Sequence, residues 1–89
     1  MIYTVTPNPA LDITWGVPGW KRGSTTRVTD IRESPGGKGL NVARVADQLG
    51  ASACAVGPLG GATGERVRDL FTSLAPSVRT RWIDSPVPT

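Results

Sequence analysis

The sequence has 89 residues, of which 38% are hydrophobic and 19% charged, so it can bury one modest core. Its 11 glycines and 8 prolines indicate many turns, and no stretch approaches the roughly 18 apolar residues of a membrane span, so we expect no membrane partner. The formal net charge is +3, and the 10 Lys and Arg side chains are scattered, which argues against nucleic acid as a partner.

The N-terminal third predicts a strand and a polar hairpin. Residues 2–6 form a β-branched and aromatic run that ends at Pro7-Asn8-Pro9, which is typical of a strand giving way to a loop. Two shorter extended stretches follow at 13–17 and 25–31, separated by a turn at 18–23. We expect them to pair as a hairpin within residues 13–34.

The remaining residues predict alternating helices and strands. A first helix ends at Gly50, because Val42, Val45, Ala46 and Leu49 recur at helical spacing. Residues 51–56 predict a buried strand, and a glycine loop with Gly57, Gly60, Gly61 and Gly64 follows it. A second helix covers 67–74 and stops before Pro76, and residues 78–83 predict a third core strand.

This order predicts an α/β fold, with a parallel-type sheet flanked by helices and the hairpin 13–34 inserted after the first strand. Three core strands and two helices are about half of an open sheet of this class. We therefore expect residues 1–89 to be the N-terminal part of one larger domain.

The cysteine and histidine content bears on the cellular compartment and on whether the chain can form a disulfide or bind zinc. With Cys54 alone and no histidine, the chain cannot form an intramolecular disulfide and lacks most zinc ligands. Residues 1–12 have neither the basic run nor the long apolar stretch of a signal peptide. We expect a cytoplasmic location, and Cys54 as a small buried core residue.

Three glycines, Gly36, Gly37 and Gly39, directly precede the first helix. Backbone N–H groups at a helix start form a general anion site. The segment is not the phosphate loop of nucleotide hydrolases, because no Ser or Thr follows Lys38. It also lacks the third glycine of a dinucleotide-binding loop.

The wider spacing carries a resemblance. The run Gly-Gly-Lys-Gly-Leu-Asn-Val-Ala at 36–43, followed by Gly50 and Gly60, resembles the first signature of the ribokinase-like, or PfkB, carbohydrate kinases. Thr-Pro-Asn-Pro-Ala-Leu-Asp at 6–12 is similar to the opening of the 1-phosphofructokinase and tagatose-6-phosphate kinase branch. Gly-Gly-Ala-Thr-Gly-Glu at 60–65 is similar to a loop in bacterial phosphofructokinases of the family.

The resemblance implies an acceptor-sugar site. It implies that Asp12 accepts hydrogen bonds from sugar hydroxyls, that Gly36 and Gly37, with Gly39, let the substrate approach the backbone, and that Asn41 contacts a sugar hydroxyl. From the residues alone, Asp12 is equally a turn or cap residue, the glycines are turn glycines, and Asn41 is a helix N-terminal cap.

Two basic residues are further candidates for substrate binding. Lys38 would contact a phosphate or sugar oxygen at the positive helix end. The resemblance places Arg27 near the substrate phosphate, against the alternative of a solvated strand arginine. It also implies that the hairpin, flanked by Trp15 and Trp20, is a β lid that covers the sugar and in some members forms a homodimer interface.

Catalysis by the family requires more than these residues. Members transfer a phosphoryl group from ATP, with Mg²⁺, using a general-base Asp in a Gly-Ala-Gly-Asp-type segment of the C-terminal half. No such run occurs here, since Asp84 is followed by Ser85 and Pro86. We therefore expect no catalytic residue within 1–89, and an ATP site formed mainly by residues beyond them.

The sequence therefore predicts the acceptor-binding part of a sugar-phosphate kinase, with fructose 1-phosphate as the first candidate substrate. Tagatose 6-phosphate and fructose 6-phosphate are the near alternatives. A non-catalytic remnant, or an interaction module that dimerises through the hairpin, is the alternative of another class.

Overall fold

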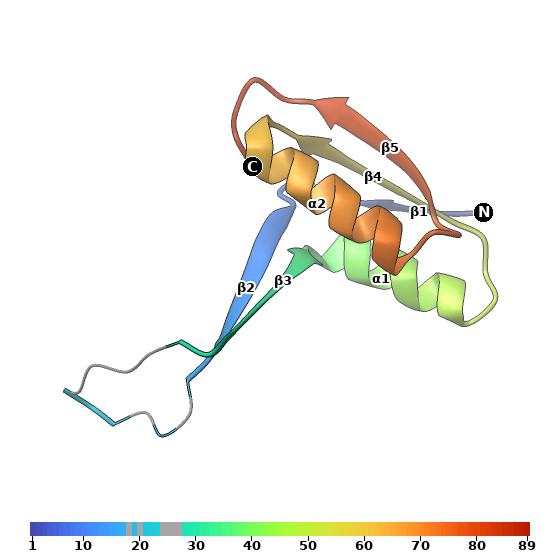
Figure 1. The fold of residues 1–89 in the computed structure, drawn as a ribbon. Helices are drawn as coiled ribbons and strands as arrows, with labels where there is room; N and C mark the ends of the chain where they lie inside the picture. Colours follow the sequence, from blue (N-terminus) through green and yellow to red (C-terminus); the bar gives the residue numbers. More distant parts are fainter. Residues whose placement is uncertain (18, 20, 24–27) are drawn as a thin grey trace.

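The computed structural model describes residues 1–17, 19, 21–23 and 28–89. Arg27 and Trp20, both named above as candidates, lie outside the described residues. The elements, in chain order, are β1 (Ile2–Val5), β2 (Ala10–Gly16), β3 (Asp30–Gly36), α1 (Lys38–Gln48), β4 (Ala53–Leu59), α2 (Gly61–Leu74) and β5 (Arg79–Asp84) (Figure 1).

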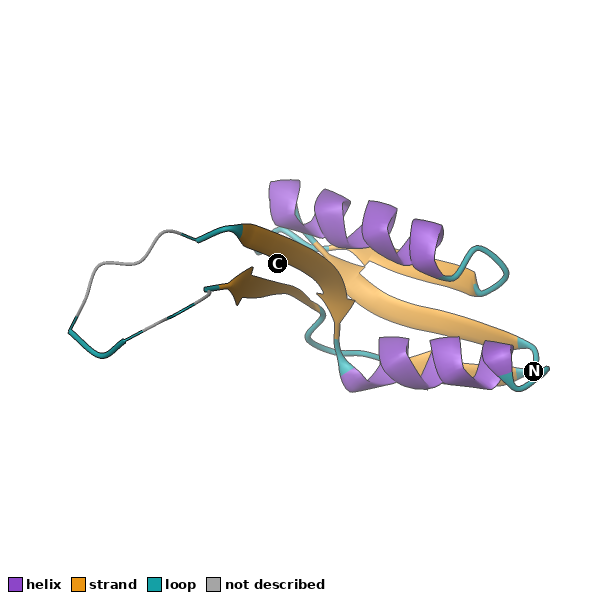
Figure 2. Cartoon of the chain, turned by 60° about the horizontal axis from the view of Figure 1, so that its bottom comes forward, coloured by secondary structure: helices purple, strands orange, loops and turns teal. Residues whose placement is uncertain are grey.

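Strands β1, β4 and β5 form a parallel sheet in the order β1-β4-β5, while β2 and β3 pair separately as an antiparallel hairpin. Both crossovers step in the same direction across the sheet, so right-handed connections put α1 and α2 on the same face. Figure 2 shows the hairpin extending away from this layered body as a two-stranded ribbon. The predicted α/β fold is confirmed.

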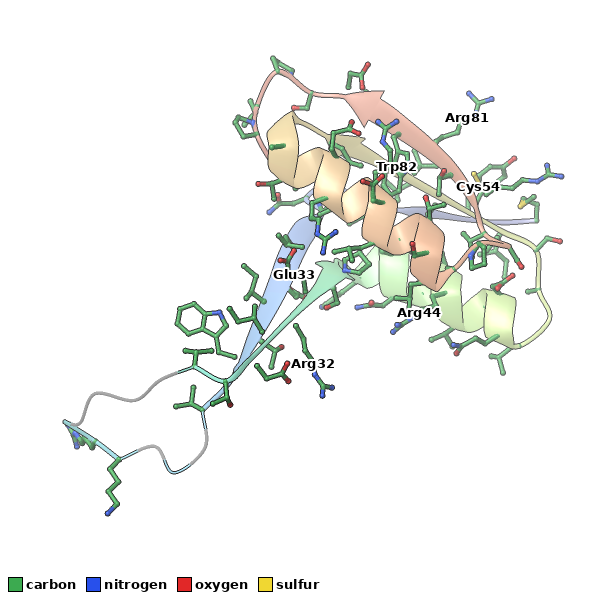
Figure 3. The ribbon with its side chains drawn as sticks, in the orientation of Figure 1. Arg32, Glu33, Arg44, Cys54, Arg81 and Trp82 are labelled. Atoms are coloured by element: carbon green, nitrogen blue, oxygen red, sulfur yellow. The ribbon has the colours of Figure 1, made fainter. Side chains whose placement is uncertain are left out.

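One hydrophobic cluster lies between the two helices and the sheet. Its largest fully buried side chains are Phe71 and Val67 from α2 and Leu40 from α1. The ring of Phe71 meets Trp82 of β5 edge-on, with centroids 6.0 Å apart, and Trp82 is labelled in Figure 3. Alternate residues of β4 complete the cluster, as expected where side chains alternate between the faces of a strand.

The other face of the sheet carries exposed apolar side chains. Tyr3 and Val5 of β1 are 68% and 66% exposed, and Ile83 of β5 is 59% exposed. Cys54 on β4 is nevertheless buried, as the sequence predicted. Parallel strands are usually buried on both faces, so this face differs from the helix-covered one within the described part of the chain.

The orientation of α1 differs from the sequence-based expectation. The helix forms where predicted, but it buries Leu40 and Ala43, whereas Val42 and Leu49 of the predicted apolar face are 54% and 82% exposed. The reason lies at its N-terminus: a Cβ on Gly39 would lie 2.9 Å from the Val5 carbonyl oxygen. That close approach turns Leu40 and Ala43 toward the sheet and leaves α1 with a second apolar face.

Strand limits also differ. In the described part of the chain, the second hairpin strand is Asp30–Gly36, so it continues past the predicted end at residue 31; residues 25–27 of that prediction lie outside the described residues. The first hairpin strand begins at Ala10, before the predicted start at residue 13. Strand β4 continues through Gly57 and Pro58, whereas the sequence predicts that the strand ends at residue 56 and a loop begins at Gly57. Pro58 fits because β4 is paired with β1 only as far as Val56, so beyond that point it has a strand on one side only.

Candidate functional site

The candidate site lies where β1 ends and the glycine segment Gly36–Gly39 enters α1. The N-cap of α1 is Gly37, with φ 133°, and no side chain among the described residues is hydrogen-bonded to cap it. The first helical hydrogen bond runs from the Asn41 N–H to the Gly37 oxygen, at 3.1 Å. The N–H groups of the preceding turn are therefore available to a ligand at the positive end of the helix.

Asp12 lies against this segment. It is paired with Ser34 in the hairpin and shares a face with the diagonal neighbour Gly36. A Cβ built on Gly36 would lie 2.6 Å from one carboxylate oxygen of Asp12 and 2.7 Å from the other. Gly36 is buried and Asp12 is exposed, so the missing side chain of Gly36 makes room for an accessible carboxylate.

Gly37 and Gly39 lie on the end of β1. A Cβ on Gly37 would come within 2.5 Å of the Thr6 Cγ2 atom, and on Gly39 it would meet the Thr6 hydroxyl. Thr6 is only 4% exposed, and its N–H donates to the Val56 oxygen at 2.9 Å. The glycines thus serve close backbone packing on Thr6, which the sequence analysis gave no role beyond its place in the run 6–12.

Lys38 and Asn41 occupy the first turn of α1 three residues apart, so they share one side of the helix, and both are exposed. Asn41 is not the N-terminal cap that the residues alone allowed, because the cap is Gly37. The fold therefore places Asp12 against Gly36 at the junction of β3 and α1, where Gly37 and the first helical turn with Lys38 and Asn41 follow. Asn41 also borders Val42, Val45, Ala46 and Leu49 on the exposed side of α1.

The hairpin is fixed at its base and exposed beyond it. The Arg66 guanidinium of α2 donates to the Glu33 carboxylate of β3 at 2.9 Å; Glu33 is labelled in Figure 3. Farther out, Trp15 and Ile31 are directly opposite each other on one face and are 63% and 61% exposed. An apolar strip thus runs along the outer hairpin.

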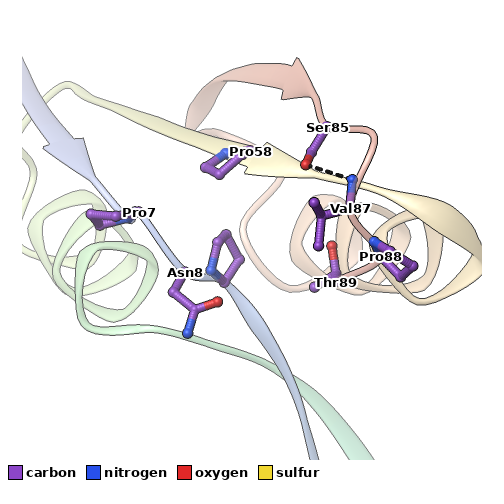
Figure 4. A pocket seen from close by; sticks show the side chains of 8 residues that line it. Pro7, Asn8, Pro58, Ser85, Val87, Pro88 and Thr89 are labelled. Carbon is purple, nitrogen blue, oxygen red and sulfur yellow. Dashed lines mark hydrogen bonds between the residues drawn. The ribbon is translucent and has the colours of Figure 1, made fainter.

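A cavity of about 170 Å³ lies beside the same end of the sheet (Figure 4). It is lined by the loop after β1, including Asn8, and by the segment after β5, including Ser85 and Thr89. In parallel α/β sheets, ligands bind outside the carboxyl ends of the strands. The cavity therefore lies at the edge of the sheet where ligands of such folds bind, but its lining does not include Asp12, Lys38 or Asn41.

The second glycine segment, at the start of α2, is occupied by the chain itself. The Gly60 N–H donates to the Thr89 hydroxyl at 2.9 Å, and the Thr89 N–H donates to the Gly60 oxygen at 3.0 Å. A Cβ on Gly60 would lie 2.6 Å from the Ser85 oxygen. These glycines accommodate the segment 85–89.

Over the described ranges, no group of three or more His, Cys, Asp or Glu side chains is placed to hold a metal ion. No helix there is both long and apolar enough to cross a membrane.

A family model described as pfkB family carbohydrate kinase matches residues 8–79. Among solved structures, phosphofructokinase-2 from Escherichia coli in complex with fructose-6-phosphate is 38% identical, with a TM-score of 0.86 over 99% of this chain. The tetrameric inhibited form of that enzyme also matches, with a TM-score of 0.85. A Thermotoga maritima protein described as "possible 1-phosphofructokinase" is 28% identical over 99% of this chain, also with a TM-score of 0.86.

The chain spans 28% of the length of each of these three structures. The similarity to these proteins therefore covers one sheet, two helices and a hairpin, which are only part of each enzyme.

Proposed function

This chain belongs to the pfkB family of carbohydrate kinases, and we propose that it forms the acceptor-binding part of an enzyme that phosphorylates a fructose phosphate with ATP. The observation that supports this most directly is the Asp12 carboxylate on Gly36, beside the uncapped N-terminus of α1. A carboxylate accepts hydrogen bonds from sugar hydroxyls, and a helix N-terminus stabilises oxygen atoms that carry negative charge.

Each group at the site has a separate task. Asp12 holds sugar hydroxyls, the backbone at Gly36 and Gly37 lies close to the ring, and Lys38 and Asn41 contact outer oxygens of the acceptor. Arg27 completes the set near the substrate phosphate. These groups orient the acceptor hydroxyl, and phosphoryl transfer depends mainly on such positioning and on charge stabilisation.

In the proposed phosphoryl transfer, the acceptor hydroxyl oxygen forms a bond to the γ-phosphorus of ATP. The bond from that phosphorus to the β–γ bridging oxygen breaks, and ADP leaves. The hydroxyl proton passes to a general base. We assign this base, the nucleotide and Mg²⁺ to residues other than 1–89, because the Gly-Ala-Gly-Asp-type segment of the family does not occur in this sequence.

Two acceptors give the same product, fructose 1,6-bisphosphate. The opening run 6–12 favours fructose 1-phosphate. The higher identity to the enzyme crystallised with fructose-6-phosphate, 38% against 28%, favours fructose 6-phosphate. We place fructose 6-phosphate first on this ground, with fructose 1-phosphate second and tagatose 6-phosphate third.

The hairpin is proposed as the lid of this site. Its polar face carries Asp12, and its outer apolar strip at Trp15 and Ile31 is suited to a second copy of the chain. A homodimer through this strip is part of the proposal, as is the cytoplasmic location.

The test is a steady-state assay of the protein as its gene encodes it, with ATP and each of the three sugar phosphates. The proposal predicts the highest kcat/KM for fructose 6-phosphate and formation of fructose 1,6-bisphosphate. If kcat/KM is highest for fructose 1-phosphate, that compound is the acceptor in place of fructose 6-phosphate. No turnover of any of the three would overturn the proposal and favour a non-catalytic interaction module.

A further inference from the structure

Thr6, which packs against the glycine segment 36–39, has a buried hydroxyl group without a hydrogen-bond partner within the described residues. The side chain is only 4% exposed. A buried hydroxyl without a partner is destabilising, and a valine would fill nearly the same space without that penalty. Threonine at this position therefore needs a reason other than packing.

The side chain is directed at the candidate site. Its Cγ2 atom contacts the Gly37 backbone and its hydroxyl faces Gly39, while its carbonyl oxygen lies against Gly57. Thr6 itself is held in place, because its N–H is bonded to the Val56 oxygen. Both branches of one rigid side chain thus support the turn whose N–H groups begin α1.

We propose that Thr6 is a positioning residue for acceptor binding, and that its hydroxyl gains a backbone partner in the glycine segment when that segment closes on the sugar phosphate. A hydrogen bond that is absent in the free protein and present in the complex stabilises only the complex. Thr6 would thereby act on acceptor affinity through Gly37 and Gly39 without touching the substrate. The inference rests on the proposed kinase function.

Thr4 provides a matched control. It lies in β1, two residues before Thr6, which directly follows that strand. Thr4 is 7% exposed, and its hydroxyl also lacks a partner in the described part of the chain. Neither Gly37 nor Gly39 has Thr4 among its nearest atoms. Removing that hydroxyl therefore isolates the general effect of relieving a buried polar group in β1.

The experiment compares Thr6→Val, Thr6→Ser and Thr4→Val in the whole gene product, by steady-state kinetics and thermal unfolding. Thr6→Val should raise the melting temperature while increasing KM for fructose 6-phosphate about tenfold, the equivalent of one lost hydrogen bond, with KM for ATP unchanged. Thr6→Ser keeps the hydroxyl and should restore KM to within about twofold. Thr4→Val should raise the melting temperature with KM unchanged.

The results that would overturn this inference can be told apart from failure of the proposed kinase function. An unchanged KM in Thr6→Val would show that Thr6 only fills space, and equal increases in Thr6→Val and Thr4→Val would assign the effect to the strand as a whole; either overturns the inference. If the unmodified protein phosphorylates no sugar phosphate, the proposed function fails and this inference fails with it. That outcome is recognised in the unmodified protein, before any variant is compared.

Discussion

The two glycine-rich helix starts of this chain are similar in sequence and different in structure. At α2, the N–H of Gly60 is bonded to the Thr89 hydroxyl, and the segment 85–89 crosses the space that a side chain would fill. At α1, the Gly37 cap has no side-chain partner in the part of the chain that the structure describes, and the Asp12 carboxylate lies against the preceding residue, Gly36. One helix start is closed by the chain, and the other remains available.

This difference teaches that glycines before a helix do not by themselves indicate a binding site. At both starts they permit close approach of other backbone or side-chain atoms. What distinguishes α1 is the set of groups around the available N–H donors: a carboxylate, a lysine and a buried hydroxyl. The following substitutions test that distinction, beginning with the largest expected effect.

Replacing the carboxylate should have the largest effect on activity. Asp12→Ala should reduce kcat/KM for the sugar phosphate about 10²- to 10³-fold, because it removes charged hydrogen bonds worth roughly 3–4 kcal/mol at the transition state. The melting temperature should change little, since Asp12 is exposed. Steady-state kinetics with Asp69→Ala, an exposed carboxylate on α2, provide the control, and equal effects in the two variants would remove Asp12 from the site.

Gly60→Ala should affect stability and not the acceptor. The new Cβ would lie 2.6 Å from the Ser85 backbone oxygen, which cannot move aside as the end of a flexible side chain can. We expect a loss of about 2–3 kcal/mol in the free energy of unfolding, as for other overpacked sites. Denaturant unfolding measures it, and a raised acceptor KM in the folded variant would contradict the assignment of α2 to packing.

Gly36→Ala should give the reverse pattern. The added Cβ would displace the Asp12 carboxylate, which can rotate, so the cost appears in acceptor binding more than in stability. We expect KM for the sugar phosphate to rise about tenfold, equivalent to ~1.4 kcal/mol. Kinetics and thermal unfolding measured together check this, and a variant that loses stability while keeping its KM would be evidence against contact between Asp12 and the acceptor.

The smallest effect is expected at the base of the hairpin. Arg66→Gln removes the ion pair with Glu33, which is partly exposed, so stability should fall by only about 0.5 kcal/mol, and less at high salt. Arg32→Gln, which breaks the exposed pair with Asp30 within the hairpin, is the control. If Arg66→Gln changes the acceptor KM and Arg32→Gln does not, the Arg66–Glu33 pair also orients the hairpin.

The sequence was sufficient for the alternating strands and helices and for the hairpin insertion, because hydrophobic periodicity and proline–glycine punctuation mark them directly. It was not sufficient for the limits of β4, since Gly57 and Pro58 signal a loop unless one knows that β1 has already ended beside them. The end of β3 was missed for a similar reason. Residues 32–34 are polar, and their strand is defined only by pairing with β2.

The candidate site was predicted in part. Asp12, Gly36, Gly37, Lys38 and Asn41 were selected from motifs, and the structure places Asp12 against Gly36 at the junction where the other three follow, although their roles remain predictions. Thr6 opens the motif at 6–12, but a role for it could not be found in this way, because its contacts with Gly37 and Gly39 depend on how α1 docks on β1. The same docking exposes Val42 and Leu49, which periodicity alone assigned to the core.

The most direct test of the difference between the two helix starts is hydrogen–deuterium exchange of the whole gene product with and without fructose 6-phosphate. Ligand contacts and segment closure slow the exchange of the amides involved. We predict protection of the amides at 36–40 on addition of the sugar phosphate, with exchange at 60–64 unchanged. Protection confined to 60–64, or absent from 36–40 at saturating ligand, would contradict the assignment of the acceptor site to α1.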